Sequence, residues 1–149
     1  MANPVCEVLL TEQPLTAPPQ ADLTETGAIV DFWGVVRRTE GETAIAAINY
    51  EAHTPMAEHQ MKALADAAAE QFVLDEVRIV HRLGAVPVGE ASLFVRVGSR
   101  RRVAAFAGCE WIIDELKKRV PVWKRPQFVG HIDGAAPVRA AAVDQAAFA

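Results

Sequence analysis

The sequence contains few cysteines and no long apolar run, and each of these absences excludes a class of protein. Cys6 and Cys109 are the only cysteines in 149 residues, so no disulfide framework or metal-ligand spacing is available. No apolar run approaches the roughly 20 residues of a membrane helix, and no charged-then-apolar leader opens the chain. A cytoplasmic protein without a metal or other cofactor is therefore expected.

The sequence also has fewer basic than acidic residues. The 15 lysines and arginines are outnumbered by 19 acidic residues, which gives a formal net charge of -4. An acidic chain without a long basic and aromatic surface does not suit nucleic-acid binding. With 51% hydrophobic residues, the chain can fill one core, and a single domain over residues 1–149 is expected.

Alternating and helical patterns predict an α+β domain with a mainly antiparallel sheet and packed helices. Strands are predicted at Val5 to Leu10, Gly27 to Arg37, Thr43 to Glu51, Asp75 to Leu83 and Ala91 to Val97. The second and third strands flank a turn at Glu40-Gly41-Glu42 and are predicted to form an antiparallel hairpin with Arg37 at the strand end.

The first predicted helix starts at Thr54-Pro55, with the threonine as N-cap and the proline in the first turn. Glu58 and Lys62 are spaced as a supporting ion pair. The apolar period places Met61, Leu64, Ala68 and Phe72 on its buried face. His53 and His59 flank the start, where a surface or capping role suits them better than metal binding.

Basic charge is gathered in one stretch, against the acidic trend of the whole chain. Nine of the fifteen lysines and arginines lie between Arg96 and Arg125. A helix is predicted from about Arg100 to Arg119, with Ser99 as N-cap and an end forced by Pro121. Its apolar period consists of Phe106, Cys109, Ile113, Leu116 and Val120.

The start of this helix carries Arg100, Arg101 and Arg102, where the positive helix end favours acidic residues. An anion bound there, such as a phosphate or carboxylate, would relieve the repulsion. The alternative is a solvated basic turn.

Lys117 falls within the apolar stripe of the helix rather than on its polar face. It either extends into solvent at the helix end or is partly desolvated and able to act as acid, base or nucleophile. Lys124, just beyond the helix, could reach the same place. Cys6 and Cys109 lie in apolar segments and are interpreted as packed, with a sulfur-carrying role as the alternative.

Three separated motifs carry a resemblance to a known family. They are Y-E-A-H-T-P-M-A-E from Tyr50, H-R-L-G-A-V-P-V-G-E-A-S from His81 and L-K-K-R-V-P-V-W-K from Leu116. In this order they resemble the large, catalytic subunit of molybdopterin synthase, over about residues 27–125.

The resemblance implies an α/β hammerhead fold and a homodimer that binds a small ubiquitin-like sulfur-carrier subunit at each end. The partner's C-terminal Gly-Gly thiocarboxylate would donate sulfur to cyclic pyranopterin monophosphate, and two transfers would build the dithiolene of molybdopterin.

The site residues follow from the same resemblance. Lys117 and Lys124 match the two catalytic lysines. Arg37 matches a substrate-binding arginine, and Arg102 matches the arginine of the family's Ser-Ala-His-Arg motif. Arg100 and Arg101 complete the predicted phosphate-binding group.

The chain departs from the family at two places. Arg101 stands where the family usually has histidine, and arginine stays protonated, so it cannot shuttle a proton. The tail, residues 129–149, diverges, and its Arg139 has no firm counterpart. A diverged paralogue that binds a phosphorylated ligand or a ubiquitin-like tail without catalysis is therefore the alternative function.

Overall fold

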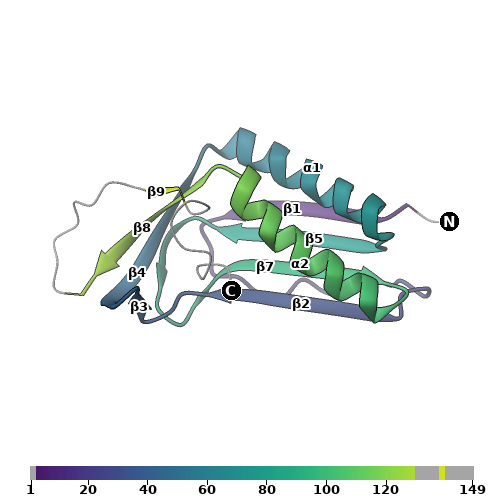
Figure 1. The fold of residues 1–149 in the computed structure, drawn as a ribbon, viewed down its shortest axis with the longest axis horizontal. Helices are drawn as coiled ribbons and strands as arrows, with labels where there is room; N and C mark the ends of the chain where they lie inside the picture. The colour runs from purple at the N-terminus through teal and green to yellow at the C-terminus, as the bar shows by residue number, and fades with distance from the viewer. Residues whose placement is uncertain (1–2, 130–137, 140–149) are drawn as a thin grey trace.

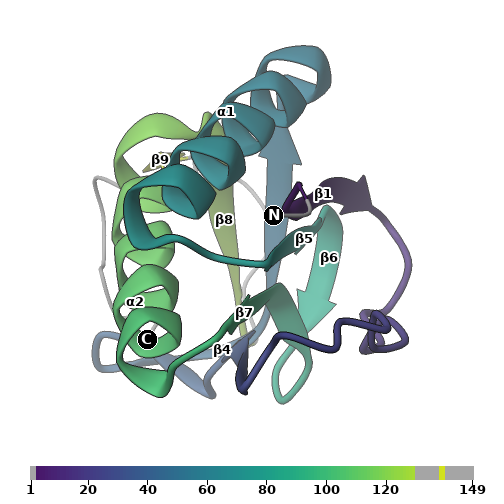
Figure 2. The ribbon, with the colours of Figure 1, turned by 90° about the vertical axis from the view of Figure 1, so that its right-hand side faces the viewer.

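The computed structural model describes residues 3–129 and 138–139, and in these ranges two helices lie against two β-sheets (Figure 1). The first sheet has the strand order β1 (Val5–Thr11), β5 (Glu76–Arg82), β7 (Ala91–Ser99) and β2 (Ala28–Val35). Strands β1 and β5 run parallel, whereas the other two pairings are antiparallel. Helices α1 (Thr54–Phe72) and α2 (Arg102–Arg119) cover one face of this sheet (Figure 2).

The second sheet stands at the end of the first (Figure 1). Its strands follow the order β3 (Thr39–Glu40), β4 (Thr43–Ala52), β8 (Val122–Phe128) and β9 (Val138–Arg139), and β6 (Gly84–Pro87) also pairs with β4. All of these pairings are antiparallel. The expected α+β class, with its mainly antiparallel sheets and the α/β hammerhead arrangement, is confirmed.

The predicted hairpin between residues 27–37 and 43–51 is wrong. Strand β2 pairs with β7 in the first sheet, whereas β4 pairs with β6 and β8 in the second. Val36 marks the crossing between the sheets, since its amide donates to the Glu90 carbonyl at 3.0 Å and its carbonyl accepts from the Gly89 amide at 2.8 Å. The predicted turn is present, but it joins β4 to the two-residue strand β3.

Helix α1 begins one residue earlier than predicted. His53 occupies the N-cap position without a side-chain cap, so Thr54 is already helical, and the Thr54 N-cap prediction is wrong. Lys62 bonds Asp66 at 2.7 Å rather than Glu58. The predicted buried face is otherwise confirmed, with Phe72 only half-buried at the helix end.

Helix α2 begins later than predicted. Arg101 is its N-cap residue, and Ser99 ends β7, where its hydroxyl donates to the Val73 carbonyl at 3.3 Å. The predicted Ser99 cap is therefore wrong. The predicted end before Pro121 is confirmed, since Val120 has left helical geometry.

The predicted buried face of α2 is confirmed for Cys109, Leu116 and Val120, with Ile113 half-buried, and is wrong for Phe106. Phe106 is 62% exposed, whereas the small residues Ala105 and Gly108 are buried. A Cβ at Gly108 would lie 3.0 Å from Leu74 Cδ1, so glycine lets the helix approach its neighbour closely. The pattern of large apolar residues did not reveal that Ala105 and Gly108 are also buried, because close packing here depends on small residues.

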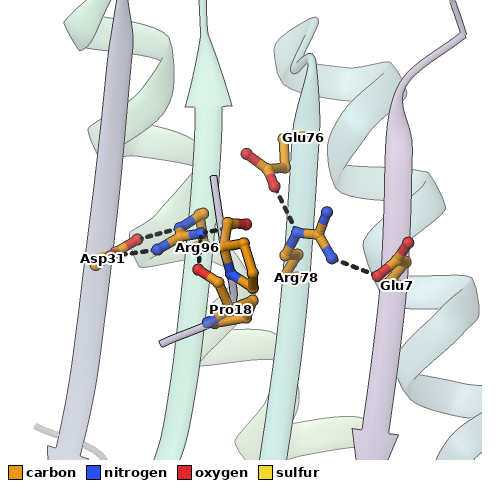
Figure 3. A network of polar contacts seen from close by, with 7 residues as sticks. Glu7, Pro18, Asp31, Glu76, Arg78 and Arg96 are labelled. Carbon is orange, nitrogen blue, oxygen red and sulfur yellow. Dashed lines mark hydrogen bonds and ion pairs between the residues drawn. The ribbon is translucent and has the colours of Figure 1, made fainter. Parts of the chain in front are cut away.

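The face of the first sheet away from the helices carries a row of ion pairs (Figure 3). Arg96 is buried; it binds both carboxylate oxygens of Asp31, at 2.7 and 2.9 Å, and donates to the Pro18 carbonyl at 2.8 Å. Arg78 lies between Glu76 and Glu7. Arg96, the first cation of the basic stretch, thus binds the Pro-rich segment to the sheet.

Across the described ranges, neither helix is long and apolar enough to cross a membrane. The tail beyond Val129 lies outside the described residues, apart from β9, in which Arg139 pairs with Trp123 of β8.

Candidate functional site

Lys117 lies in the last turn of α2 and is largely withdrawn from water. Its exposed fraction is 8%, whereas the next residue, Lys118, has a side chain that is 69% exposed. This contrast favours a partly desolvated lysine over one that extends into solvent. The burial occurs where the negative end of the helix dipole favours a cation.

Lys124 is buried even more completely. Its exposed fraction is 0%, and its Nζ lies 2.6 Å from Glu40 Oε1. It stands on β8 directly opposite Tyr50 of β4. Only Val120 and Pro121 separate α2 from β8, so both buried lysines lie where the end of α2 meets the second sheet (Figure 1).

Arg37 lies in the segment that crosses between the sheets. It follows β2, is exposed, and stands three positions before Glu40. The segment that contains Arg37 therefore leads directly into the short strand β3, which ends at Glu40, the partner of Lys124. The structure places Arg37 on the same side of the molecule as the second sheet.

The three arginines lie at the opposite end of α2. Arg100, Arg101 and Arg102 are exposed and line an open depression of about 410 Å³ together with Gly27, Ala28 and Val103. The first turn of α2 holds no acidic residue. Free helix N–H groups and arginine side chains together suit a phosphate or carboxylate.

Gly27 allows this depression to form. Its amide donates to the Ser99 carbonyl at 3.0 Å, and a Cβ on Gly27 would lie 2.4 Å from the Arg100 carbonyl oxygen. The backbone beneath the arginines is therefore packed too closely to accept a side chain at this position.

The length of α2 separates the two groups of cations. Lys117 follows Arg102 by fifteen residues on the helix, a distance of about 22 Å at 1.5 Å per residue. The basic stretch of the sequence is thus divided between two surfaces. One chain does not bring the three arginines and the two lysines to a common centre.

Tyr50 stands opposite Lys124 and contacts other buried polar side chains. Tyr50 packs edge-on against His81, with ring centroids 5.1 Å apart. Burial raises the pKa of Tyr50 to about 12, opposed by a hydrogen bond with Ser92. Burial also lowers the pKa of His81 to about 4, opposed by the Arg82 carbonyl, which lies 2.9 Å from Nδ1. Both rings are therefore neutral near pH 7.

Sequence reasoning missed Glu40 as a partner of Lys124. The two residues are 84 positions apart, and their contact depends on the pairing of β4 with β3 and β8. No local pattern signals such a contact. The place of Tyr50 beside this ion pair follows from the same tertiary pairing.

The cysteines behave as packed residues. Burial is the main cause that raises the pKa values of Cys6 and Cys109 to about 11, so both thiols stay protonated near neutral pH and are poor nucleophiles. The part of the chain that the structure describes contains no group of three or more histidine, cysteine, aspartate or glutamate side chains able to hold a metal ion.

Comparison with known proteins identifies the family of this chain. The family model described as "MoaE protein" matches residues 10–119, and the chain belongs to this family. A relative from Emericella nidulans, named molybdopterin synthase catalytic subunit, is 40% identical over 119 residues, which are 80% of this chain and 61% of that protein.

A relative from Thermoplasma volcanium with the same name is 41% identical over 101 residues, which cover 68% of this chain and 74% of that protein. Among solved structures, the molybdopterin biosynthesis MoaE protein from Burkholderia ambifaria has a TM-score of 0.78 and 28% identity, and the match covers 96% of this chain and 95% of that one.

Proposed function

We propose that this chain is a molybdopterin synthase catalytic subunit and acts as a sulfurtransferase. It would take sulfur from the C-terminal thiocarboxylate of a small ubiquitin-like subunit and transfer it to cyclic pyranopterin monophosphate. Membership of the family and the names of the relatives support this function. The observation that carries it is the burial of Lys117 and Lys124 at one end of α2.

Each group of cations has a separate task in this reaction. The exposed arginines Arg100, Arg101 and Arg102, with Arg37, hold the substrate phosphate through charge-assisted hydrogen bonds. Lys117 and Lys124 polarise the thiocarboxylate carbonyl and stabilise the negative charge that develops as sulfur is transferred. Their low exposure strengthens this electrostatic effect because little water competes.

The active site is built from two copies of the chain. The arginines lie about 22 Å along α2 from Lys117, too far to hold one end of a small substrate whose other end reacts beside the lysines. In a homodimer, the arginines of one copy can meet the lysines of the other. Val103 and Phe106, 74% and 62% exposed beside the arginines, offer apolar area for that contact.

The test is a single-turnover reaction of this protein with a thiocarboxylated small subunit and cyclic pyranopterin monophosphate, in which dithiolene product is followed. Product formation at a rate that depends on both components is expected. Tight binding of both components without product would contradict the synthase assignment.

That second outcome defines the alternative function, a binding paralogue without catalysis. Arg101 is the observation that favours it, because arginine in place of the usual family histidine binds phosphate but cannot shuttle a proton. Restoring histidine with Arg101→His distinguishes the two: a paralogue inactive for this reason gains turnover, whereas an active synthase already turns over.

A further inference from the structure

Glu40 forms a short contact with Lys124, the most deeply buried of the lysines. Its Oε1 lies 2.6 Å from Lys124 Nζ, and its side chain is 15% exposed, whereas that of Lys124 is 0% exposed. At this distance the carboxylate accepts a charge-assisted hydrogen bond from the ammonium group. Both charges of the pair are thus largely removed from water.

A short hairpin fixes the position of this carboxylate. Glu40 is the last residue of β3 and stands opposite Thr43 of β4. Gly41, which follows it, has a φ of 62°, a backbone conformation that glycine adopts without strain. The hairpin therefore aims Glu40 at β8, on which Lys124 stands, and Arg37 lies only three positions earlier in the chain.

A buried ammonium without an anion is strongly destabilised, and the usual response is loss of its proton. A lysine that must polarise a carbonyl has to keep its charge, because a neutral amine provides a much weaker electrostatic field. Tyr50, which stands opposite Lys124, and His81, which packs against Tyr50, are neutral near pH 7. Glu40 is therefore the acidic side chain in contact with Lys124 that can keep it charged.

We propose that Glu40 is a positioning residue that holds Lys124 as a charged ammonium in a fixed orientation at the sulfur-transfer site. The inference rests on the proposed function for its catalytic meaning. Lys124 then acts as a fixed cation and hydrogen-bond donor toward the thiocarboxylate carbonyl, and it does not serve as a base. Glu40 itself acts through Lys124 and does not touch the substrate.

The test compares Glu40→Gln, which keeps the size and removes the charge, with Glu40→Asp, which keeps the charge on a shorter side chain. In Glu40→Gln the single-turnover rate is expected to fall about 10- to 100-fold, the effect of losing one hydrogen bond to a charged group. The loss should grow as the pH rises, since the unpaired buried ammonium is then neutralised more easily. Glu40→Asp should retain more of the rate, with a pH profile between those of the wild type and Glu40→Gln.

The matched control is Glu76→Gln. Glu76 is also buried and paired with a cation, Arg78, but in the first sheet. Its replacement should leave the rate and the pH profile unchanged even where it lowers stability. Wild-type turnover by Glu40→Gln at every pH would overturn the proposal, and so would an equal loss at every pH.

A second readout does not depend on activity. The chain has four lysines, so ¹³Cε-lysine labelling gives few resonances, and that of Lys124 is identified by its loss in Lys124→Arg. In Glu40→Gln this resonance should reach the neutral-amine position at lower pH than in the wild type, and Glu40→Asp should lie between the two. Identical titrations in all three proteins would contradict the proposal.

This readout also separates the two claims. If the wild-type protein forms no product, the proposed function fails, and the lysine titration still decides whether Glu40 holds Lys124 charged. Should Glu40→Gln not fold, the comparison of Glu40→Asp with the wild type gives the same answer.

Discussion

Two buried lysines are the least expected residues of this molecule. Removing a charged group from water costs several kcal/mol unless it is paired, so such residues are rare in a protein interior. Lys117 and Lys124 lie at the same end of α2, and Lys124 Nζ lies 2.6 Å from Glu40 Oε1. Pairs of desolvated lysines suit a reaction in which negative charge develops on a carbonyl.

Replacing Lys117 with alanine should abolish sulfur transfer while the fold stays intact. The expected loss of turnover is at least about 100-fold, because an electrostatic stabiliser of this kind contributes roughly 3–4 kcal/mol to the transition state. Lys118→Ala is the matched control, since this neighbouring side chain is 69% exposed. Circular dichroism and single-turnover rates measure both, and wild-type turnover by Lys117→Ala would refute the role of this lysine.

His81 should make stability depend on pH. Its pKa falls from 6.5 to about 4 on folding because burial disfavours the charged ring. The unfolded chain therefore binds more protons between these pH values, and the free energy of unfolding decreases as the pH falls from 6.5 toward 4. The decrease due to His81 is about 3 kcal/mol.

Urea denaturation of the wild type and of His81→Gln at several pH values measures how the free energy of unfolding depends on pH. The variant should lack that part of the acid destabilisation, although it starts from a lower stability because a packed ring is lost. Parallel curves for the two proteins over the whole range would show that His81 does not titrate in this way.

At the residue scale, the sequence alone predicts some site residues and not others. Lys117 is found because a lysine within an apolar helical stripe is unusual, and this signal is local. Glu40 is not found, because its partner lies 84 positions away and on another strand. The partners of Arg96 are not found for the same reason, since Asp31 and Pro18, which bind its guanidinium, are distant in the sequence.

At the scale of elements, small residues decide how α2 sits on the first sheet. Ala105 and Gly108 are buried, a Cβ on Gly108 would lie 3.0 Å from Leu74 Cδ1, and one on Gly27 would lie 2.4 Å from the Arg100 carbonyl oxygen. Close packing of this kind is sensitive to a single added carbon.

Gly27→Ala should displace the arginine segment at the start of α2. The added Cβ would lie 2.4 Å from the Arg100 carbonyl oxygen, so the backbone must move. The expected cost is roughly 1–3 kcal/mol of stability, together with weaker binding of the phosphorylated substrate. Denaturation and titration calorimetry measure the two effects.

Gly34→Ala is the control for this experiment. Its Cβ would meet Leu93 at 3.3 Å in the same sheet, far less severely and away from the arginines. It should lower stability slightly and leave substrate affinity unchanged. Equal affinity in Gly27→Ala and Gly34→Ala would show that the arginines do not depend on this contact.

The positions of the elements follow from local patterns, but their pairing does not. Apolar alternation and Pro121 suffice to place β1, β2, β4, β5, β7 and the end of α2 to within a few residues, whereas β8 was not predicted. The hairpin of residues 27–37 with 43–51 failed because a turn between two strands does not require them to pair. Val36 crosses between the sheets instead, held by hydrogen bonds to Glu90 and Gly89.

At the scale of the whole molecule, α2 is a spacer with a different group of cations at each end. The fold class and the family follow from the order of elements and the three motifs, whereas the division of the basic stretch follows only from the length of the helix. A charge cluster in a sequence is not a cluster in space when a helix of eighteen residues passes through it.

The central claim is that arginines and lysines of different copies form one site, and mixed dimers test it most directly. One chain carries Lys117→Ala, and the other carries alanine in place of Arg100, Arg101 and Arg102. A mixed dimer then has one site with all its cations and one site that lacks both groups.

The two variants, each with its own affinity tag, are co-expressed, and sulfur transfer by the mixture is compared with that of each variant alone. Random pairing makes about half of the dimers mixed, so the account predicts recovery to about a quarter of wild-type activity from two inactive parents. A mixture that stays as inactive as its parents would contradict it, because a site formed within one chain is broken in every copy.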